Sequence, residues 1–209
     1  MIPVPPAQIE RQLNYYGDKP FPAQRRVIFS SKRVIQVASG EQYGKSWLAG
    51  TFLKTRYPLG KLFWIVGPDF DQTKEEFNYF ASSLQEKGAV ADIRTPDQGA
   101  QRLWTTTGQY VETKSSDDEM KIANKAPDGI IMAEAGQQTR SVYERCRARC
   151  GPNRGWLLLA GTFEEERPWY DDLAVELEAE GAFFSCPSWD NTLKYPGGFS
   201  WACPHYNEQ

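Results

Sequence analysis

The hydrophobic residues of the chain gather in five short runs, and most of the stretches between these runs have helical spacing. The runs have the length and apolar composition of buried strands, and they cover residues 33–39, 62–67, 129–134, 156–162 and 182–188. Helices are expected over residues 45–56, 73–86, 138–150 and 169–180, with a shorter one ending near residue 16. Buried runs that alternate with helices predict an α/β fold with a mainly parallel central sheet flanked by helices on both faces.

Two parts of the chain depart from this alternation. Three segments with alternating polar and apolar residues are expected to be further strands, at 90–95, 102–106 and 109–114. The last two are joined by Thr107-Gly108, which predicts a hairpin. Residues from 189 onward are rich in proline, glycine and aromatic residues and show no period. Asp71 lies just before one predicted helix and is expected to be its N-cap.

The composition is that of a folded domain, with 209 residues, 40% of them apolar and 24% charged. This length corresponds to about one domain. The formal net charge of −3 argues against a uniformly basic DNA-coating protein, although it allows local basic patches. No run approaches the ~18–20 apolar residues of a membrane span, and the first residues lack the pattern of a secretory signal.

Four cysteines do not form a disulfide framework in a chain of this length. Cys146 and Cys150 lie four residues apart on a predicted helix, and Cys203 and His205 flank Pro204. These four groups could be assembled into a zinc site on paper, but their spacing follows no familiar ligand pattern. We therefore expect ordinary reduced cysteines, as in a cytosolic protein.

The most informative motif is S-G-E-Q-Y-G-K-S at residues 39–46, between the first strand and the helix after it. This context is typical of a P-loop (Walker A), whose backbone N–H groups and helix N-terminus surround a β-phosphate. Gly44 permits close approach, Lys45 places a cation against the β- and γ-phosphates, and Ser46 offers a hydroxyl to Mg²⁺. Because the consensus has glycine in place of Ser39, the alternative is a simple turn before a helix.

Glu134 ends the third apolar run, at the sheet edge where ligands bind in folds of this kind. A carboxylate there can orient and polarise the water that attacks a γ-phosphate, and a solvent-facing acid is the alternative. The usual pattern has an aspartate just before this glutamate, whereas this chain has Ala133. Ser46 and Glu134 would then hold the metal with water or with another acid, for which Asp69 is a candidate.

Three further features have two interpretations each. The amide of Gln24 could read N6 and N7 of adenine, or it could be a surface glutamine. Thr162, after Gly161, could sense the γ-phosphate through the water held by Glu134, or it could simply end a strand. A group of arginines could form a solvated helix face or contact phosphates of DNA or of a neighbouring subunit: Arg140, Arg145, Arg147, Arg149 and Arg154. N-K-A-P-D at 124–128 is similar to a guanine-reading motif with one residue too many, and we expect a loop.

With these residues in place, the chain resembles the ATPase domain of phage large terminase subunits, the motors that package DNA into proheads. The resemblance runs from Gln24 to about Gly198 and rests on six ordered segments: FPAQRR, VASGEQYGKS, WIVGPDF, GIIMAEAGQ, RGWLLLAGTFEEERPWYDDL and PSWDNTLKYPGG. It implies a RecA-like ASCE P-loop NTPase that uses ATP and Mg²⁺ and works as a ring in the host cytoplasm. The partners that it implies are double-stranded DNA, the portal or prohead and a small terminase subunit, with no membrane.

The resemblance also implies roles for individual residues. Lys45 and Glu134 would be catalytic, Ser46 and Glu134 would hold the metal, and Gly161 and Thr162 would couple hydrolysis to motion. The residues expected to bind ATP are Ser39, Gly40, Glu41, Gln42, Tyr43, Gly44, Lys45, Ser46 and Trp47, together with Gln24 and Arg25. No arginine finger can be named, because Glu41-Gln42-Tyr43 and Lys121 and Lys125 stand where the family can carry arginines.

We expect one ATPase domain over residues 1–209, with a core at about 20–188, a tail at 189–209 and no nuclease domain or nuclease activity. The predicted function is ATP-hydrolysing translocation of double-stranded viral DNA into a prohead. Two alternatives stay open. One is a helicase-like DNA translocase, against which the tail motifs argue. The other is a nucleotide-gated ring-assembly module with little hydrolysis.

Overall fold

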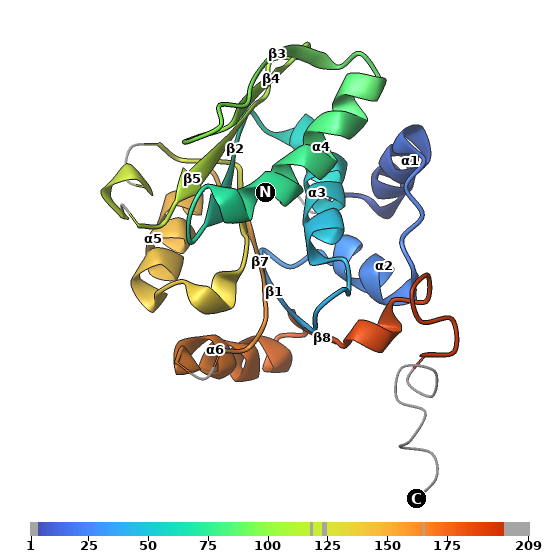
Figure 1. Ribbon diagram of the computed structural model, residues 1–209, viewed down its shortest axis with the longest axis vertical. Coiled ribbons are helices and arrows are strands. Elements are labelled where there is room, and N and C mark those ends of the chain that lie inside the picture. The colour runs from blue at the N-terminus through green and yellow to red at the C-terminus, as the bar shows by residue number, and fades with distance from the viewer. Residues whose placement is uncertain (1–3, 118, 123–124, 165, 199–209) are drawn as a thin grey trace, which may run out of the picture.

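The computed structural model describes residues 4–117, 119–122, 125–164 and 166–198 (Figure 1). Its helices are α1 (Pro6–Tyr16), α2 (Pro22–Ile28), α3 (Lys45–Arg56), α4 (Lys74–Glu86), α5 (Arg140–Cys150) and α6 (Pro168–Ala179). Its strands are β1 (Val34–Ser39), β2 (Leu62–Gly67), β3 (Val90–Arg94), β4 (Arg102–Thr105), β5 (Tyr110–Ser115), β6 (Gly129–Met132), β7 (Trp156–Gly161) and β8 (Phe183–Cys186). Short 3₁₀ turns lie at η1 (Tyr57–Leu59), η2 (Asp71–Thr73), η3 (Glu119–Ile122), η4 (Ala135–Gln137) and η5 (Ser188–Asp190).

The described strands form one sheet in the order β3-β4-β5-β2-β6-β7-β1-β8. Along this order, every pair of neighbouring strands in the part β5-β2-β6-β7-β1-β8 is parallel. β4 is antiparallel to both β3 and β5. The mainly parallel α/β fold predicted from the sequence is confirmed, including the hairpin of β4 and β5. Because β7 lies between β1 and β6, the carboxyl ends of these three strands come side by side at one edge of the sheet.

Helices cover both faces of the sheet, and two hydrophobic cores lie between the layers (Figure 1). Along β2, Phe63 and Ile65 belong to the core under α1 to α4, whereas Trp64 and Val66 belong to the core under α5 and α6. This alternation follows from the two-residue period of a strand, and it explains why the run has no polar position. A strand buried on both faces holds its carboxyl end in a fixed place.

The predicted N-cap of α4 is wrong. The helix begins at Lys74 after η2, and Asp71 lies within that turn, where its carboxylate pairs with Lys74. Asp69, two residues earlier, supports this turn, because its Oδ1 accepts a hydrogen bond of 2.8 Å from the Gln72 N–H. An acid close to a helix start therefore organises the preceding turn instead of the helix itself.

Among the described residues, no helix combines the length and the apolar composition that crossing a membrane requires. Cys146 and Cys150 are buried on α5, and no cluster of potential metal ligands occurs in the described part of the chain. Cys203 and His205, the other half of the zinc site considered above, lie outside the described residues.

Candidate functional site

The loop between β1 and α3 turns sharply so that its backbone can face a ligand. Gln42 and Gly44 both have left-handed backbone conformations, with φ of 61° and 90°. Gly44 is the N-cap residue of α3, and no side chain caps this helix start. The first N–H groups of a twelve-residue helix therefore lack a side-chain acceptor, and they point to where an anion would be stabilised by the helix dipole.

Packing of a buried aromatic side chain holds the loop between β1 and α3 in place. Tyr43 is fully buried, and its ring meets Phe21 edge-to-face at a centroid distance of 5.3 Å. Burial raises the pKa of the Tyr43 hydroxyl far above its ordinary value. Gly40 donates its N–H to the Cys186 carbonyl at 3.3 Å, which ties the loop to the end of β8. Tyr43, which the sequence placed in the ATP-binding set, therefore uses its side chain to anchor the loop.

The structure brings Lys45 and Glu134 together. The Lys45 Nζ lies 3.4 Å from the Glu134 Oε1, and both side chains are largely shielded from solvent, with exposed fractions of 14% and 26%. Glu134 stands two residues beyond the end of β6 and has a φ of 44°. A non-glycine residue in this conformation carries strain, and such strain clusters at functional sites. The turn aims the carboxylate at the P-loop lysine.

A hollow of about 280 Å³ lies above this pair. It is lined by loop and strand-end residues and by one side of α4: Glu41, Gln42, Tyr43, Gly44, Lys45, Ser46, Trp47, Glu75, Tyr79 and Glu134. These described lining residues include one cation, Lys45, and three carboxylates, those of Glu41, Glu75 and Glu134. A triphosphate placed here would need further positive charge, and a divalent cation held by the oxygen ligands can supply it.

Sequence reasoning missed Glu76, the residue of α4 that follows the lining residue Glu75. Its side chain is buried, with an exposed fraction of 4% for the residue. Burial raises the pKa of Glu76 to about 7, the nearby Ser46 hydroxyl lowers it by hydrogen bonding, and the negative charge of Glu134 raises it. A signal was present in the sequence, because Glu76 falls on the same face as Phe80 and Leu84, which face the core. A charged residue on the apolar face of a helix calls for a partner.

Gly161 and Thr162 lie against the turn that carries Glu134. A Cβ at Gly136 would come within 2.0 Å of the Thr162 carbonyl oxygen, and one at Gly161 within 2.8 Å of the Gly136 nitrogen. The Thr162 hydroxyl donates to Glu164 Oε1 at 3.1 Å, so it is not directed at Glu134. The backbone after β7 and the turn after β6 are therefore in direct contact, while the coupling role of Thr162 stays a prediction.

Gln24 is buried, so the alternative of a surface glutamine is wrong. Its Nε2 lies 3.3 Å from the position of a Cβ at Gly44, next to the phosphate loop. Arg25, also predicted to bind ATP, projects elsewhere: its guanidinium pairs with Glu10 and lies 4.7 Å from the centroid of the Phe29 ring. The structure thus brings Gln24, but not the Arg25 side chain, to the loop.

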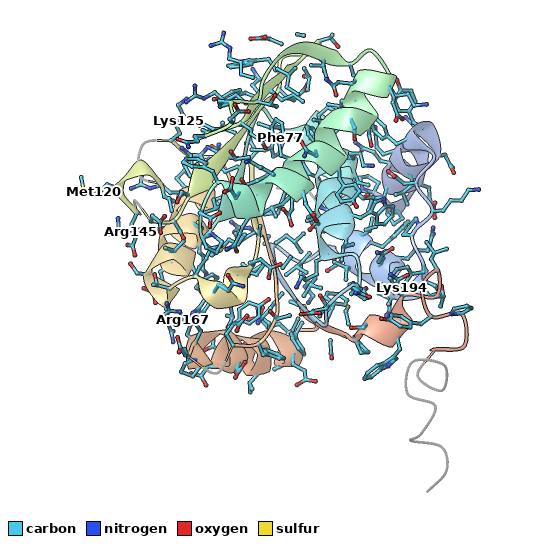
Figure 2. The ribbon with its side chains drawn as sticks, viewed as in Figure 1. Phe77, Met120, Lys125, Arg145, Arg167 and Lys194 are labelled. Atoms are coloured by element: carbon cyan, nitrogen blue, oxygen red, sulfur yellow. The ribbon has the colours of Figure 1, made fainter. Side chains whose placement is uncertain are left out.

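The remaining candidates lie outside the hollow. The Asp69 carboxylate is engaged by Gln72, and Asp128 of the N-K-A-P-D segment accepts hydrogen bonds from the Lys61 and Leu62 N–H groups. Residues 125–128 form a loop, as predicted. On α5, Arg140 pairs with Glu144 and Arg145 with Glu119. Figure 2 shows Arg145 on the side of the view opposite Lys194 of the tail.

The fold and the loop define the class: an eight-stranded, mainly parallel sheet with a P-loop, the RecA-like P-loop architecture. Solved structures with this fold include the ATPase domain of the large terminase of Thermus phage P74-26. That domain has 17% sequence identity and a TM-score of 0.71, and the match covers 94% of this chain and 91% of that domain. The fold of this chain is thus that of large terminase ATPase domains.

Two longer large terminases share the same fold. The enzyme of a thermophilic bacteriophage, in a structure with ADP, has 16% identity and a TM-score of 0.63, and the match covers 82% of this chain and 46% of that chain. The enzyme of bacteriophage HK97 has 16% identity and a TM-score of 0.61, with 87% and 43% covered. This chain therefore spans a little under half of those two proteins. No protein-family profile matches the sequence, and no curated protein is detectably similar.

Proposed function

We propose that this chain is the ATP-hydrolysing motor domain of a phage large terminase subunit, which drives double-stranded DNA into a prohead. The observation that carries the proposal is the Lys45–Glu134 pair, 3.4 Å apart beneath the open N-terminus of α3. A cation beside a helix N-terminus suits a phosphate, and a carboxylate beside the cation suits the water that attacks it. The partners by family resemblance are other copies in a ring, a portal or prohead and a small terminase subunit.

The residues would act in a fixed order. An incoming phosphate competes with the Glu134 carboxylate for the Lys45 ammonium, because both are anions and the two positions adjoin. Once Lys45 turns to the phosphate, Glu134 is free to accept a hydrogen bond from water and to orient it for in-line attack. Loop N–H groups and Lys45 meet the charge that develops on the phosphoryl oxygens.

Mg²⁺ is the cofactor that this chemistry implies. The Ser46 hydroxyl and the acids around the hollow are the hard oxygen ligands that Mg²⁺ prefers, and the surplus of carboxylates over cations there fits a bound dication. When bound, Mg²⁺ would supply positive charge that offsets the negative charge of the phosphate groups. Gln24, buried beside the loop, is the residue that we propose for the adenine.

Two variants test the site. Lys45→Ala should weaken ADP binding at least about tenfold, since a charge-assisted hydrogen bond contributes about 1.5–3 kcal/mol. Glu134→Gln should leave ADP affinity within a few-fold and lower ATP turnover by about 10²-fold or more. Titration calorimetry measures the first effect and phosphate release the second.

Matched controls come from exposed positions away from the hollow. Lys61→Ala, at the amino end of β2, and Glu178→Gln, on α6, should leave both measurements unchanged. If the parent chain gives no heat with ADP, the proposed nucleotide site is wrong. If Glu134→Gln hydrolyses ATP at the parent rate, the proposed catalytic role of that carboxylate is wrong.

One observation favours a second candidate, a nucleotide-gated ring-assembly module. The described lining of the hollow contains no arginine, and Ala133 replaces an acid beside Glu134. A site with these gaps could bind ATP and order an interface with little hydrolysis. Steady-state phosphate release with and without double-stranded DNA separates the two, because only the motor is expected to turn over and to respond to DNA.

A further inference from the structure

The site has no acid immediately before Glu134. Ala133 is fully buried after the end of β6, where its N–H donates to the Val66 carbonyl at 2.8 Å and its carbonyl accepts from Gln138 Nε2 at 2.7 Å. A methyl group in this place offers no oxygen to a cation. An additional carboxylate for a divalent metal beside Ser46 would therefore come from another element.

Glu76 of α4 is placed to be that carboxylate. Its side chain lies within hydrogen-bonding reach of the Ser46 hydroxyl, the group predicted to bind the metal. Its Oε2 is buried and has no hydrogen-bond partner in the part of the chain that the structure describes. A buried carboxylate oxygen that no donor satisfies carries a free-energy penalty, so its position calls for a ligand.

The charges near Glu76 point to a cation as that ligand. Among neighbouring charges, those of Glu134 and Glu75 raise the pKa of Glu76 most, and both are negative. Lys45, the nearest predicted phosphate ligand, is paired with Glu134. With Lys45 paired to Glu134, the Glu76 carboxylate lies beside the Ser46 hydroxyl among negative neighbours, which is an oxygen-rich setting of the kind that a hard divalent ion prefers.

The approach of Glu76 to Ser46 depends on a glycine one helical turn further along α3. A Cβ at Gly50 would come within 2.8 Å of the Tyr79 Cβ and 3.1 Å of the Glu76 carbonyl oxygen. With hydrogen in that place, the backbones of α3 and α4 pack closely, and Ser46 and Gly50 present the same face to α4. Figure 2 labels Phe77, the neighbour of Glu76, on the part of α4 that passes beside α3.

We propose that Glu76 completes a divalent-metal site beside Ser46. It takes the role of the acid that usually stands at the position of Ala133. This inference rests on the proposed function, because the metal is expected with a nucleotide. Glu76 would act as a positioning residue, holding the ion or its water ligands against Ser46 while Glu134 serves the attacking water. The carboxylate is thus supplied by a helix packed on α3 instead of by a strand end.

The test measures how much Mg²⁺ strengthens ADP binding, by titration calorimetry of the full chain in Mg²⁺ and in EDTA. Glu76→Gln keeps the shape of the side chain and removes its charge. We expect this variant to lose about tenfold of the Mg²⁺-dependent gain, which corresponds to one charge-assisted contact, and to bind ADP in EDTA like the parent. Glu86→Gln, on the last turn of the same helix, removes an equal charge and should keep the full gain.

A rescue variant separates metal binding from loop shape. Ala133→Asp added to Glu76→Gln should restore part of the Mg²⁺ gain, because it returns an acid to the usual position. Equal gains in the parent and in Glu76→Gln would overturn the proposal, as would a Glu76→Gln defect of the same size in Mg²⁺ and EDTA.

If Glu76→Gln does not fold, Glu76→Asp replaces it: a partial loss of the Mg²⁺ gain supports the proposal, and a full gain overturns it. A parent chain that binds no ADP would overturn the proposed function itself, whereas the other failures leave that function standing.

Discussion

The two glycines of the predicted phosphate loop, Gly40 and Gly44, are glycine for different physical reasons. Gly44 needs a φ of 90°, which side chains rarely adopt, so its role is conformational. Gly40 has no such backbone, but a Cβ there would lie 2.4 Å from the Ser188 Oγ. The close approach of Ser188, just before the tail, therefore favours glycine at position 40.

The contact between Gly40 and Ser188 gives a prediction at the residue scale. Gly40→Ala should lower the free energy of unfolding by about 1–3 kcal/mol through overpacking. Ser188→Ala alone should change it by less than about 0.5 kcal/mol. Because the close atom is the Ser188 hydroxyl, the double variant should recover most of the loss. Denaturant unfolding of the four chains measures this, and equal losses in the single and double variants would show that the hydroxyl is not the obstacle.

At the scale of elements, one buried ion pair joins three helices. The Lys54 Nζ on α3 lies 2.7 Å from Asp18 Oδ2, just beyond α1, and donates to Ser83 Oγ of α4 at 3.0 Å. The exposed fractions of the Lys54 and Asp18 side chains are 2% and 9%. Burial lowers the pKa of Lys54, and the Asp18 carboxylate opposes this shift. The pair fixes how α1 and α4 pack on α3, and α4 carries Glu76.

Removing one partner of this pair should cost more than removing both. Asp18→Asn leaves a buried ammonium without its counter-charge, and we expect a loss of about 3–5 kcal/mol in the free energy of unfolding. Adding Lys54→Met removes the stranded charge and should return a large part of that loss. Urea denaturation of the parent, the single variant and the double variant provides the measurement. Additive losses would mean that the pair has no special role in the packing of these helices.

The sequence predicted most elements well, because the apolar runs end sharply. β2 ends at Gly67, directly before Pro68, and Gly155 stands just before β7, so the predicted strand bounds lie within a few residues of those observed. The cap of α4 was wrong because Thr73 directs its hydroxyl to the Phe70 carbonyl at 2.7 Å and closes a 3₁₀ turn ahead of the helix. Such a turn depends on local hydrogen bonds that the hydrophobic pattern does not encode.

The site was predictable only where its residues sit at strand ends. Lys45 and Glu134 follow buried strands, and the topology alone brings the ends of β1 and β6 to one edge of the sheet. Glu76 could not be placed in this way, because its approach to Ser46 depends on how closely α4 packs on α3 at Gly50. Helix-to-helix distances are set by tertiary packing, and sequence periodicity gives only the buried face.

At the scale of the whole molecule, the tail rests on the phosphate loop from the far end of the chain. Asn191 Nδ2 donates to the Gln42 carbonyl at 2.8 Å, and the Tyr195 hydroxyl donates to Gln42 Oε1 at 3.3 Å. Gln42 is the non-glycine loop residue with a left-handed backbone, φ 61°. The tail therefore holds Gln42 in a strained conformation within the predicted phosphate site, and we expect tail packing and ligand binding to be linked.

This linkage gives a prediction that works in both directions. Asn191→Ala removes a hydrogen bond that contributes about 0.5–1.5 kcal/mol, so ADP affinity should fall by about two- to tenfold. Binding linkage is reciprocal, so ADP should protect residues 188–198 from hydrogen exchange in the parent chain, and by a smaller factor in the variant. Thr192→Ala, at the exposed neighbouring position, is the control and should behave as the parent in both measurements. ADP affinity and tail protection that changed independently of each other would show that the tail packs on the loop without sensing its ligand.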